Sequence, residues 1–291
     1  MSIKNHPLFL GVAGMLSLPI IVTLLACRTL AATPLDQIVA GTPLVQTQTP
    51  VAATANNLAA MANNLATTPL PPRDPNPIYR AGLDAFAAND YPLAETRFRE
   101  ALAIAPETAD LHNSLGLALR QQGKLAEATE ALQTAVSLNP AFAEAHYNLA
   151  ALYQAQERWP DAEVNYRTAL ATDSSLAAAA NGLGDAYLAQ GKLTAAAAAY
   201  EHALAQDAQL LAAYRGLAAI MAREGRLDKA IEMLETAVGQ RPNYLPALYD
   251  LGLIYAHQGQ TETAQQLFAE IISLAPDSEW AALALAQGTS Q

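Results

Sequence analysis

Residues 109–142 read ADLHNSLGLALRQQGKLAEATEALQTAVSLNPAF, and this stretch decides the fold. Apolar residues recur there at intervals of three and four, which is the period of a helix with one apolar face. They are Leu111, Leu115, Ala118 and Leu119 in the first half, and Leu125, Ala128, Leu132, Ala135 and Val136 in the second. Between the halves stands Gly123, which can adopt the left-handed conformation that ends a helix. The stretch therefore predicts two helices joined by a short turn.

The same 34-residue pattern occurs six times in succession, with no insertion or deletion between copies. The copies are 75–108, 109–142, 143–176, 177–210, 211–244 and 245–278. One alanine recurs in all six, as Ala94, Ala128, Ala162, Ala196, Ala230 and Ala264. A small residue precedes it as Gly82, Gly116, Ala150, Gly184, Ala218 and Gly252, and a bulky one follows as Phe98, Leu132, Tyr166, Tyr200, Leu234 and Phe268. Such self-similarity predicts an all-α solenoid in which each helix pair stacks on its neighbours.

These positions resemble the tetratricopeptide repeat (TPR) family. The resemblance implies a right-handed superhelix of six helix-turn-helix repeats, and we expect a C-terminal capping helix within 279–291, where Trp280 and Leu283 are apolar. Members of this family are interaction modules. The chain is therefore expected to bind protein or an extended peptide.

The turn inside each copy carries a further expectation. Glycine fills the same place in four copies, as Gly123, Gly191, Gly225 and Gly259, and Asn89 fills it in the first. Asparagine is the next best residue for a left-handed conformation. Glu157 occupies the place in the third copy. We therefore expect that turn to be the least regular of the six.

In the TPR family the first helix of each repeat lines the concave surface of the superhelix. Carried over to this chain, the resemblance predicts a partner-binding face with tyrosines for contact area and asparagines for pairing with a peptide backbone. The predicted residues are Tyr79, Arg80, Leu83, Asn113, Leu117, Tyr147, Asn148, Asn181, Asp185, Arg215 and Tyr249, with Arg120, Gln154 and Arg223 beside them. The alternative is an ordinary surface on which Asp185 and Arg215 pair with one another.

The chain is acidic, with a formal net charge of −11. Many of the acidic residues fall on the predicted second helices, as a solvated outer face would require. They include Glu95, Glu100, Glu127, Glu130, Glu163, Glu201, Glu232 and Glu235. Since a phosphate backbone would be repelled, nucleic acid is not an expected partner.

No sequence motif indicates catalysis. The chain has no glycine-rich phosphate loop, no paired-histidine zinc motif and no nucleophile elbow, and the repeats leave no span for a catalytic domain. His112 and His146 occupy equivalent places in adjacent copies, where packing is the expected role and a metal site the alternative. We expect no enzyme activity, no cofactor and no bound metal.

The first 27 residues form an export or anchoring segment. Residues 8–26 carry no charge, and Lys4 precedes them. Leu24-Leu25-Ala26-Cys27 resembles the lipobox of bacterial lipoproteins, in which the cysteine becomes the lipidated N-terminus. Two alternatives stay open, an uncleaved signal anchor long enough to span a bilayer core and simple secretion.

Residues 28–74 are rich in Thr, Pro, Ala and Asn and predict a disordered tether. Together these features predict a TPR scaffold held to a membrane by its N-terminus, on the extracytoplasmic face of a bacterial envelope. Its layout is similar to that of pilotin lipoproteins of type IV pilus systems. The alternative function is a periplasmic glycan- or solute-binding accessory protein.

Overall fold

The computed structural model describes residues 77–288, and it contains helices without strands over that range. The helices are α4 (Pro77–Ala87), α5 (Tyr91–Ile104), α6 (Ala109–Gln121), α7 (Leu125–Leu138), α8 (Ala143–Ala155), α9 (Trp159–Thr172), α10 (Ala177–Ala189), α11 (Leu193–Gln206), α12 (Leu211–Arg223), α13 (Leu227–Gln240), α14 (Leu245–His257), α15 (Thr261–Leu274) and α16 (Glu279–Gly288). The expected all-α class is therefore confirmed.

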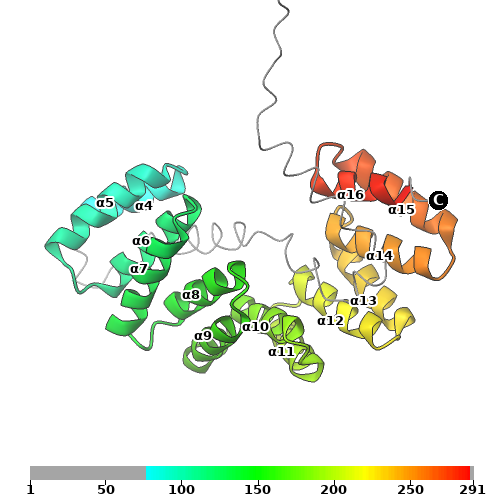
Figure 1. Cartoon of the computed structure of the whole chain (residues 1–291), viewed down its shortest axis with the longest axis horizontal. Coiled ribbons are helices and arrows are strands. Elements are labelled where there is room, and N and C mark those ends of the chain that lie inside the picture. The colour runs from blue at the N-terminus through cyan, green and yellow to red at the C-terminus, as the bar shows by residue number, and fades with distance from the viewer. Residues whose placement is uncertain (1–76, 289–291) are drawn as a thin grey trace, which may run out of the picture. The chain divides into compact units, whose positions relative to one another are not determined.

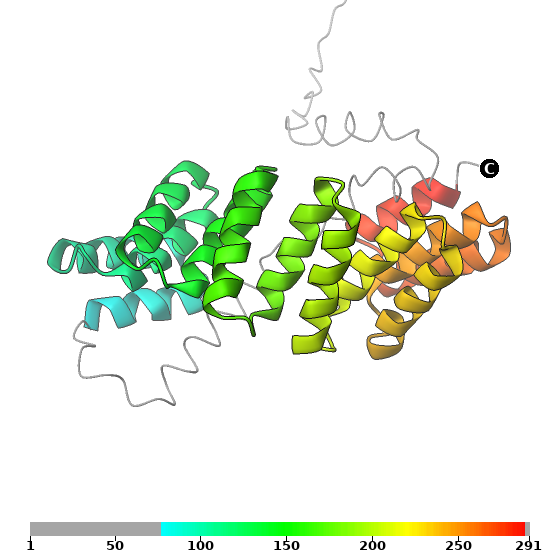
Figure 2. The same ribbon diagram turned by 90° about the horizontal axis from the view of Figure 1, so that it is seen from below.

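The helices from α4 to α15 form successive pairs, each made of a first helix and a second helix (Figure 1). Every second helix also packs against the first helix of the following pair, as α5 does on α6 and α13 on α14. Figure 2 shows the same succession from below. The last helix, α16, packs on α15 and also touches α14, so it covers the end of the series as the expected cap.

The recurring alanine forms the floor of each pair. Five of its six copies are fully buried, and Ala264 is 2% exposed. The bulky residue four positions later packs under the small residue of the first helix. At Gly82, for example, a Cβ atom would lie 2.5 Å from Phe98 Cε1. Because a real side chain cannot approach so closely, the small residue is what lets the two helices meet.

The third turn corrects one expectation. Glu157 adopts φ 58°, in the same left-handed region as Gly123 at φ 73°. The amide of Arg158 donates to the carbonyl of Tyr153 at 2.9 Å, as Lys124 does to Leu119 at 3.0 Å. The third turn is thus as regular as the others, because the helices on either side fix its hydrogen bonds. Glu157 instead holds a backbone conformation that suits glycine better.

The acidic second-helix residues also need a correction, because two of them are not solvated. The Glu95 and Glu163 side chains are 13% and 15% exposed. Each accepts from a lysine of the next pair at 2.7 Å, Glu95 from Lys124 and Glu163 from Lys192. Gln122 and Gln190 add a second hydrogen bond at 2.8 and 2.9 Å. These clamps hold neighbouring pairs together at the turns.

The expected signal or anchor segment of 1–27, including Cys27, and the expected tether of 28–74 lie outside the described residues. Within residues 77–288, no helix is both long and apolar enough to cross a membrane.

Candidate functional site

The first helices form a row in which each lies beside the next. Contacts join α4 to α6, α6 to α8, α8 to α10 and α10 to α12, and a buried ion pair joins α12 to α14. We call the surface of this row the first-helix face. All eleven of the predicted partner-binding residues belong to these first helices.

Six of those eleven residues are buried by the packing of one first helix on the next. They are Asn113, Leu117, Tyr147, Asn148, Arg215 and Tyr249. Tyr79, Leu83, Asn181 and Asp185 are partly exposed, and Arg80 is exposed. The packing therefore leaves a smaller accessible set than the sequence suggested, and the binding role of all eleven stays a prediction.

At the N-terminal end of the row, side-chain hydrogen bonds that we call polar rungs connect a position of one first helix to the place one residue beyond its equivalent on the next first helix. The hydroxyls of Tyr79 on α4 and Ser114 on α6 are 3.1 Å apart. One repeat later, the Asn148 side-chain amide of α8 donates to Asn113 Oδ1 of α6 at 2.9 Å. Partners in both rungs are 35 residues apart, so each rung bridges two copies.

At the C-terminal end the rung is an ion pair. Arg215 of α12 donates from Nε to Asp250 Oδ2 of α14, and both side chains are 5% exposed. The Arg215 guanidinium lies 5.5 Å from the centre of the Trp280 ring on α16. This corrects the alternative that Arg215 pairs with Asp185. The partner lies on the next first helix, one residue beyond the place equivalent to Arg215, which Tyr249 occupies.

Two tyrosines of second helices give the middle of the row a different arrangement. Tyr166 of α9 and Tyr200 of α11 run beneath glycines of the next first helix. A Cβ atom at Gly182 would lie 2.3 Å from Tyr166 Cζ, and one at Gly216 would lie 2.3 Å from Tyr200 Cζ. The two glycines thus open a path for the tyrosine hydroxyls to reach the first-helix face.

Those hydroxyls enter one hydrogen-bonded network around Asp185 of α10. Tyr200 donates to Asp185 Oδ1 at 2.7 Å, and Tyr166 donates to Gln154 Oε1 at 2.7 Å. Gln154 of α8 in turn donates to Asp185 Oδ2 at 3.3 Å, and Asn181 donates to the same oxygen at 3.5 Å. Neutral donors from three helices therefore converge on one carboxylate.

An arginine lies near this network. The charge of Arg120 on α6 interacts with Tyr147 and Tyr166, whose ring centres are 6.0 Å apart. Arg120 Nη1 is inaccessible to solvent and has no hydrogen-bond partner among the described residues. We call the whole group the central cluster: Arg120, Tyr147, Gln154, Tyr166, Asn181, Asp185 and Tyr200.

Burial dominates the protonation of the central cluster. It raises the pKa of Asp185 to about 6, although the hydrogen bonds from Tyr200 and Gln154 and the charge of Arg215 act in the opposite direction. Burial also raises the pKa of the Tyr166 and Tyr200 hydroxyls well above the ordinary value. The two tyrosines therefore remain donors at neutral pH, and the carboxylate is charged at a high desolvation cost.

The sequence did not single out Tyr166, Tyr200, Gly182 or Gly216 as parts of this face. The two tyrosines were read as core residues of the second helices. A signal was available, because in these two copies alone a tyrosine at the bulky position is followed sixteen residues later by glycine. Elsewhere phenylalanine or leucine is followed by Ser114, Asn148 or Asp250.

The histidines among the described residues offer no site of their own. His112 Nε2 lies 2.8 Å from the carbonyl of Pro106, and His146 Nε2 lies 3.2 Å from that of Pro140. Each ring thus bonds to the loop that follows the preceding second helix. In the part of the chain that the structure describes, no three His, Cys, Asp or Glu side chains are placed to hold a metal.

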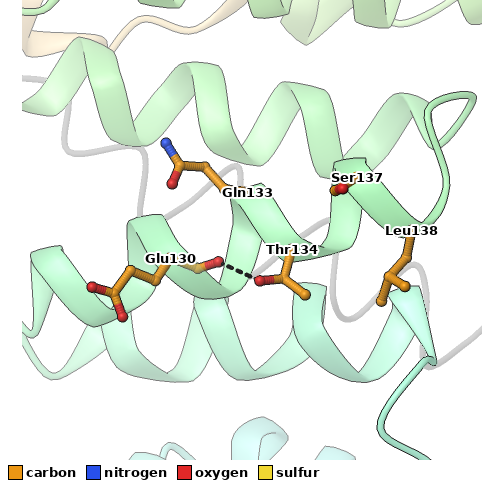
Figure 3. A pocket seen from close by; sticks show the side chains of 5 residues that line it. All are labelled: Glu130, Gln133, Thr134, Ser137 and Leu138. Atoms are coloured by element: carbon orange, nitrogen blue, oxygen red, sulfur yellow. Dashed lines mark hydrogen bonds between the residues drawn. The ribbon is translucent and has the colours of Figure 1, made fainter.

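A surface depression lies on the second helix α7 alone. Its lining side chains are Glu130, Gln133, Thr134, Ser137 and Leu138 (Figure 3). The Thr134 hydroxyl donates to the carbonyl of Glu130 at 2.8 Å. The lining residues of the depression all belong to one helix, and the Thr134 hydroxyl is already bonded. Polar groups from several helices do not converge there, as they do in the central cluster.

Sequence comparisons agree with this architecture. A family model described as a TPR repeat matches residues 116–157, and two described as tetratricopeptide repeat match residues 147–210 and 221–287. The chain belongs to the tetratricopeptide repeat family. No curated protein sequence matches it significantly.

Solved TPR structures share the fold. PilW, described as a widely conserved type IV pilus biogenesis factor, is 21% identical with a TM-score of 0.65, over 72% of this chain and 96% of its own. Pseudomonas aeruginosa pilF is 18% identical with a TM-score of 0.62, over 72% and 96%. MamA is 25% identical with a TM-score of 0.50, over 56% and 95%. As a TPR-type protein, this chain has the architecture of a protein-interaction scaffold.

Proposed function

We propose that this protein is a membrane-tethered scaffold that binds a segment of a partner protein on its first-helix face. The observation that carries the proposal is the central cluster, where polar groups from several helices converge on a partly exposed part of that face. Convergent polar groups of this kind fix the orientation of a ligand. The repeats supply the row of helices and no reaction chemistry.

Site-specific photo-crosslinking tests the position of the partner. A photo-reactive residue at Ala155, which is exposed at the end of α8 and follows Tyr147 and Ala151 at four-residue intervals, reports on the first-helix face. The matched control is Val164 on α9, which is 61% exposed. We expect the full chain to capture a protein from Ala155 and not from Val164. Capture from Val164 alone, or no captured protein at all, would overturn the proposal.

Membrane attachment is the second part of the proposal and rests on residues 1–27, with the apolar run 8–26 and Cys27 as support. We propose lipid on Cys27 as the anchor, since two acyl chains hold a protein stably where one is marginal. Cys27→Ser should lose the lipid label and accumulate as the unprocessed precursor. An uncleaved anchor predicts an unchanged mass in the membrane, and wild-type protein found wholly in the soluble fraction would contradict both.

The glycan- or solute-binding function is the competing proposal. The same crosslinking variants separate it from the scaffold. Glycan-array binding by the full chain, together with no protein captured from Ala155, would favour a glycan ligand.

A further inference from the structure

Two opposite charges of the central cluster, Arg120 and Asp185, form no ion pair in the described part of the chain, and Asp185 feels the charge of Arg215 only at longer range. Arg120 forms no hydrogen bond from its buried Nη1, and no ion pair involves it. Asp185 is bonded by Tyr200, Gln154 and Asn181 alone, all of them neutral. Both residues are partly exposed, although the Nη1 atom of Arg120 itself is inaccessible to solvent.

At the C-terminal end of the same row of helices, two buried charges form an ion pair with each other. There Arg215 and Asp250 are paired and 5% exposed. An unpaired charge in a low-dielectric site is costly, and the cost falls when an opposite charge with good hydrogen-bond geometry arrives. A ligand that brings an opposite charge to Arg120 or to Asp185 would therefore gain binding free energy by lowering this cost.

The two charges also share a neighbour. The charges of Arg120 and Asp185 both act on the buried Tyr147 hydroxyl of α8, so the arginine and the carboxylate lie near the same side chain. Adjacent helices pack about 8–10 Å apart, and an extended chain advances about 3.3 Å per residue. One short peptide segment can thus present one group to α6 and another to α10.

Resting on the scaffold function proposed above, we propose that the central cluster binds an extended protein segment that carries both an acidic and a basic side chain. The acidic group sits at Arg120 of α6 and the basic group at Asp185 of α10. A planar guanidinium favours a carboxylate, with short charge-assisted hydrogen bonds. A lysine or arginine of the segment would donate to Asp185, which already accepts from neutral groups only. The partner is therefore a segment of mixed charge, and uniformly acidic or uniformly basic segments bind less well.

Fluorescence anisotropy with synthetic peptides tests this directly on the full wild-type chain. The probes are labelled Ser/Ala peptides with one Glu and one Lys separated by about two to six residues, in both orders. Matched probes carry the Glu alone, the Lys alone or neither. We expect at least one mixed-charge peptide to bind about tenfold more tightly than every single-charge peptide. Equal affinities across the whole set would overturn the inference, and this comparison needs no variant protein.

Two variants then assign the charges. Arg120→Gln should abolish the contribution of the peptide Glu and leave that of the Lys, and Asp185→Asn should do the reverse. Arg97→Gln and Asp228→Asn, which remove the same charges from the second helices α5 and α13, are matched controls and should change neither. Equal weakening of all peptides by Arg120→Gln would instead indicate general disruption and contradict the assignment.

The failure of this inference can be told apart from failure of the scaffold function. A protein partner crosslinked from Ala155 whose affinity is unchanged by both Arg120→Gln and Asp185→Asn would refute the mixed-charge segment and leave the scaffold standing. The absence of any crosslinked protein would refute the scaffold itself.

Discussion

The junctions between helix pairs are of two kinds, although all are built from the same repeat. In the central junctions, Tyr166 and Tyr200 reach beneath Gly182 and Gly216 to the first-helix face. In the flanking junctions, Phe98, Leu132 and Leu234 stop in the core, and Ser114, Asn148 and Asp250 form rungs with the preceding first helix. A tyrosine on the second helix thus occurs with a glycine on the next first helix. A phenylalanine or leucine on the second helix occurs with a polar side chain on the next first helix.

The flanking junctions contribute to stability, whereas the central junctions present polar groups for the proposed binding. The flanking rungs bond neighbouring repeats to each other, which holds the stack together, while Asn113 Nδ2 and Asp250 Oδ1 have no hydrogen-bond partner among the described residues. The central junctions instead send donors to Asp185 and leave its charge and that of Arg120 unpaired. The repeat therefore keeps its backbone geometry while two positions, sixteen residues apart, determine whether a junction packs or presents polar groups.

The largest expected effect comes from breaking the last flanking junction. Arg215→Met removes the partner of Asp250 and leaves a buried carboxylate uncompensated, so we expect the full chain to lose about 3–5 kcal/mol of unfolding free energy in urea denaturation. Arg215→Met combined with Asp250→Leu removes both charges and should recover most of the loss. If the single variant unfolds like the wild type, the pair does not hold the junction.

A second test converts a central junction into the flanking kind. Gly216→Asn should cost about 1–3 kcal/mol, because its Cβ would strike the Tyr200 ring. Tyr200→Leu should cost about 2 kcal/mol by leaving a cavity. The double variant reproduces the Leu132 and Asn148 pairing, so its loss should be smaller than the sum by about 1 kcal/mol or more. Strict additivity in urea denaturation would show that the tyrosine and the glycine are independent.

Much of the architecture could be predicted from the sequence because its causes are local. The period of three and four residues, the alanine floor and the left-handed turn residue each act within one copy. The helix pairs and the capping helix follow from them. Glu157 was misjudged because its neighbours, Tyr153 and Gln154, hold the turn whatever residue occupies it.

The site could be predicted only in outline, because exposure on the first-helix face depends on the neighbouring copy. Asn148 looks like a binding residue within its own repeat, yet its rung to Asn113 buries it. The partner of Arg215 depends on which first-helix positions face each other across a junction, and this is not visible within one 34-residue unit. The hydroxyl of Tyr200 bonds to Asp185 within its own copy, but the space for it depends on Gly216 of the next copy.

A smaller effect should be the same at both kinds of junction, since the outer clamps do not follow the division. Hydrogen bonds from Lys124, Gln122 and Arg99 lower the pKa of Glu95 to about 2, against the effect of burial, which is larger than any one of them. At Glu163, burial is the largest single effect and raises the pKa. The hydrogen bonds from Lys192 and Gln190 act against it, and the pKa is lowered overall. We expect Glu95→Gln at a flanking junction and Glu163→Gln at a central one to cost about 1 kcal/mol each at pH 7.

The lowered pKa of Glu95 determines how this loss of stability changes with pH. A carboxyl whose pKa is lower in the folded protein stabilises it fully above the ordinary pKa of 4.5 and loses that contribution as the pH falls toward about 2. Wild type and Glu95→Gln should therefore converge in unfolding free energy over that window. Thr129→Val is the control, because Thr129 occupies the equivalent place and accepts from Gln156 at 3.3 Å without carrying a charge, so it should show no such convergence. A constant difference down to pH 2 would contradict the clamp.

The smallest effect concerns the turns inside the helix pairs. Each of the six turns contains one residue in the left-handed conformation. Glu157 holds φ 58° at a place that glycine fills in four other copies. Glycine adopts this region without strain, so Glu157→Gly should raise the unfolding free energy by about 0.5–1 kcal/mol, less the entropy that glycine loses on folding. Glu157→Ala removes the same charge and keeps the strain, so it should give no gain, and Gly191→Glu should lose a similar amount. Equal stabilisation by glycine and alanine would mean that the charge of Glu157, and not its backbone conformation, is what the third turn has to accommodate.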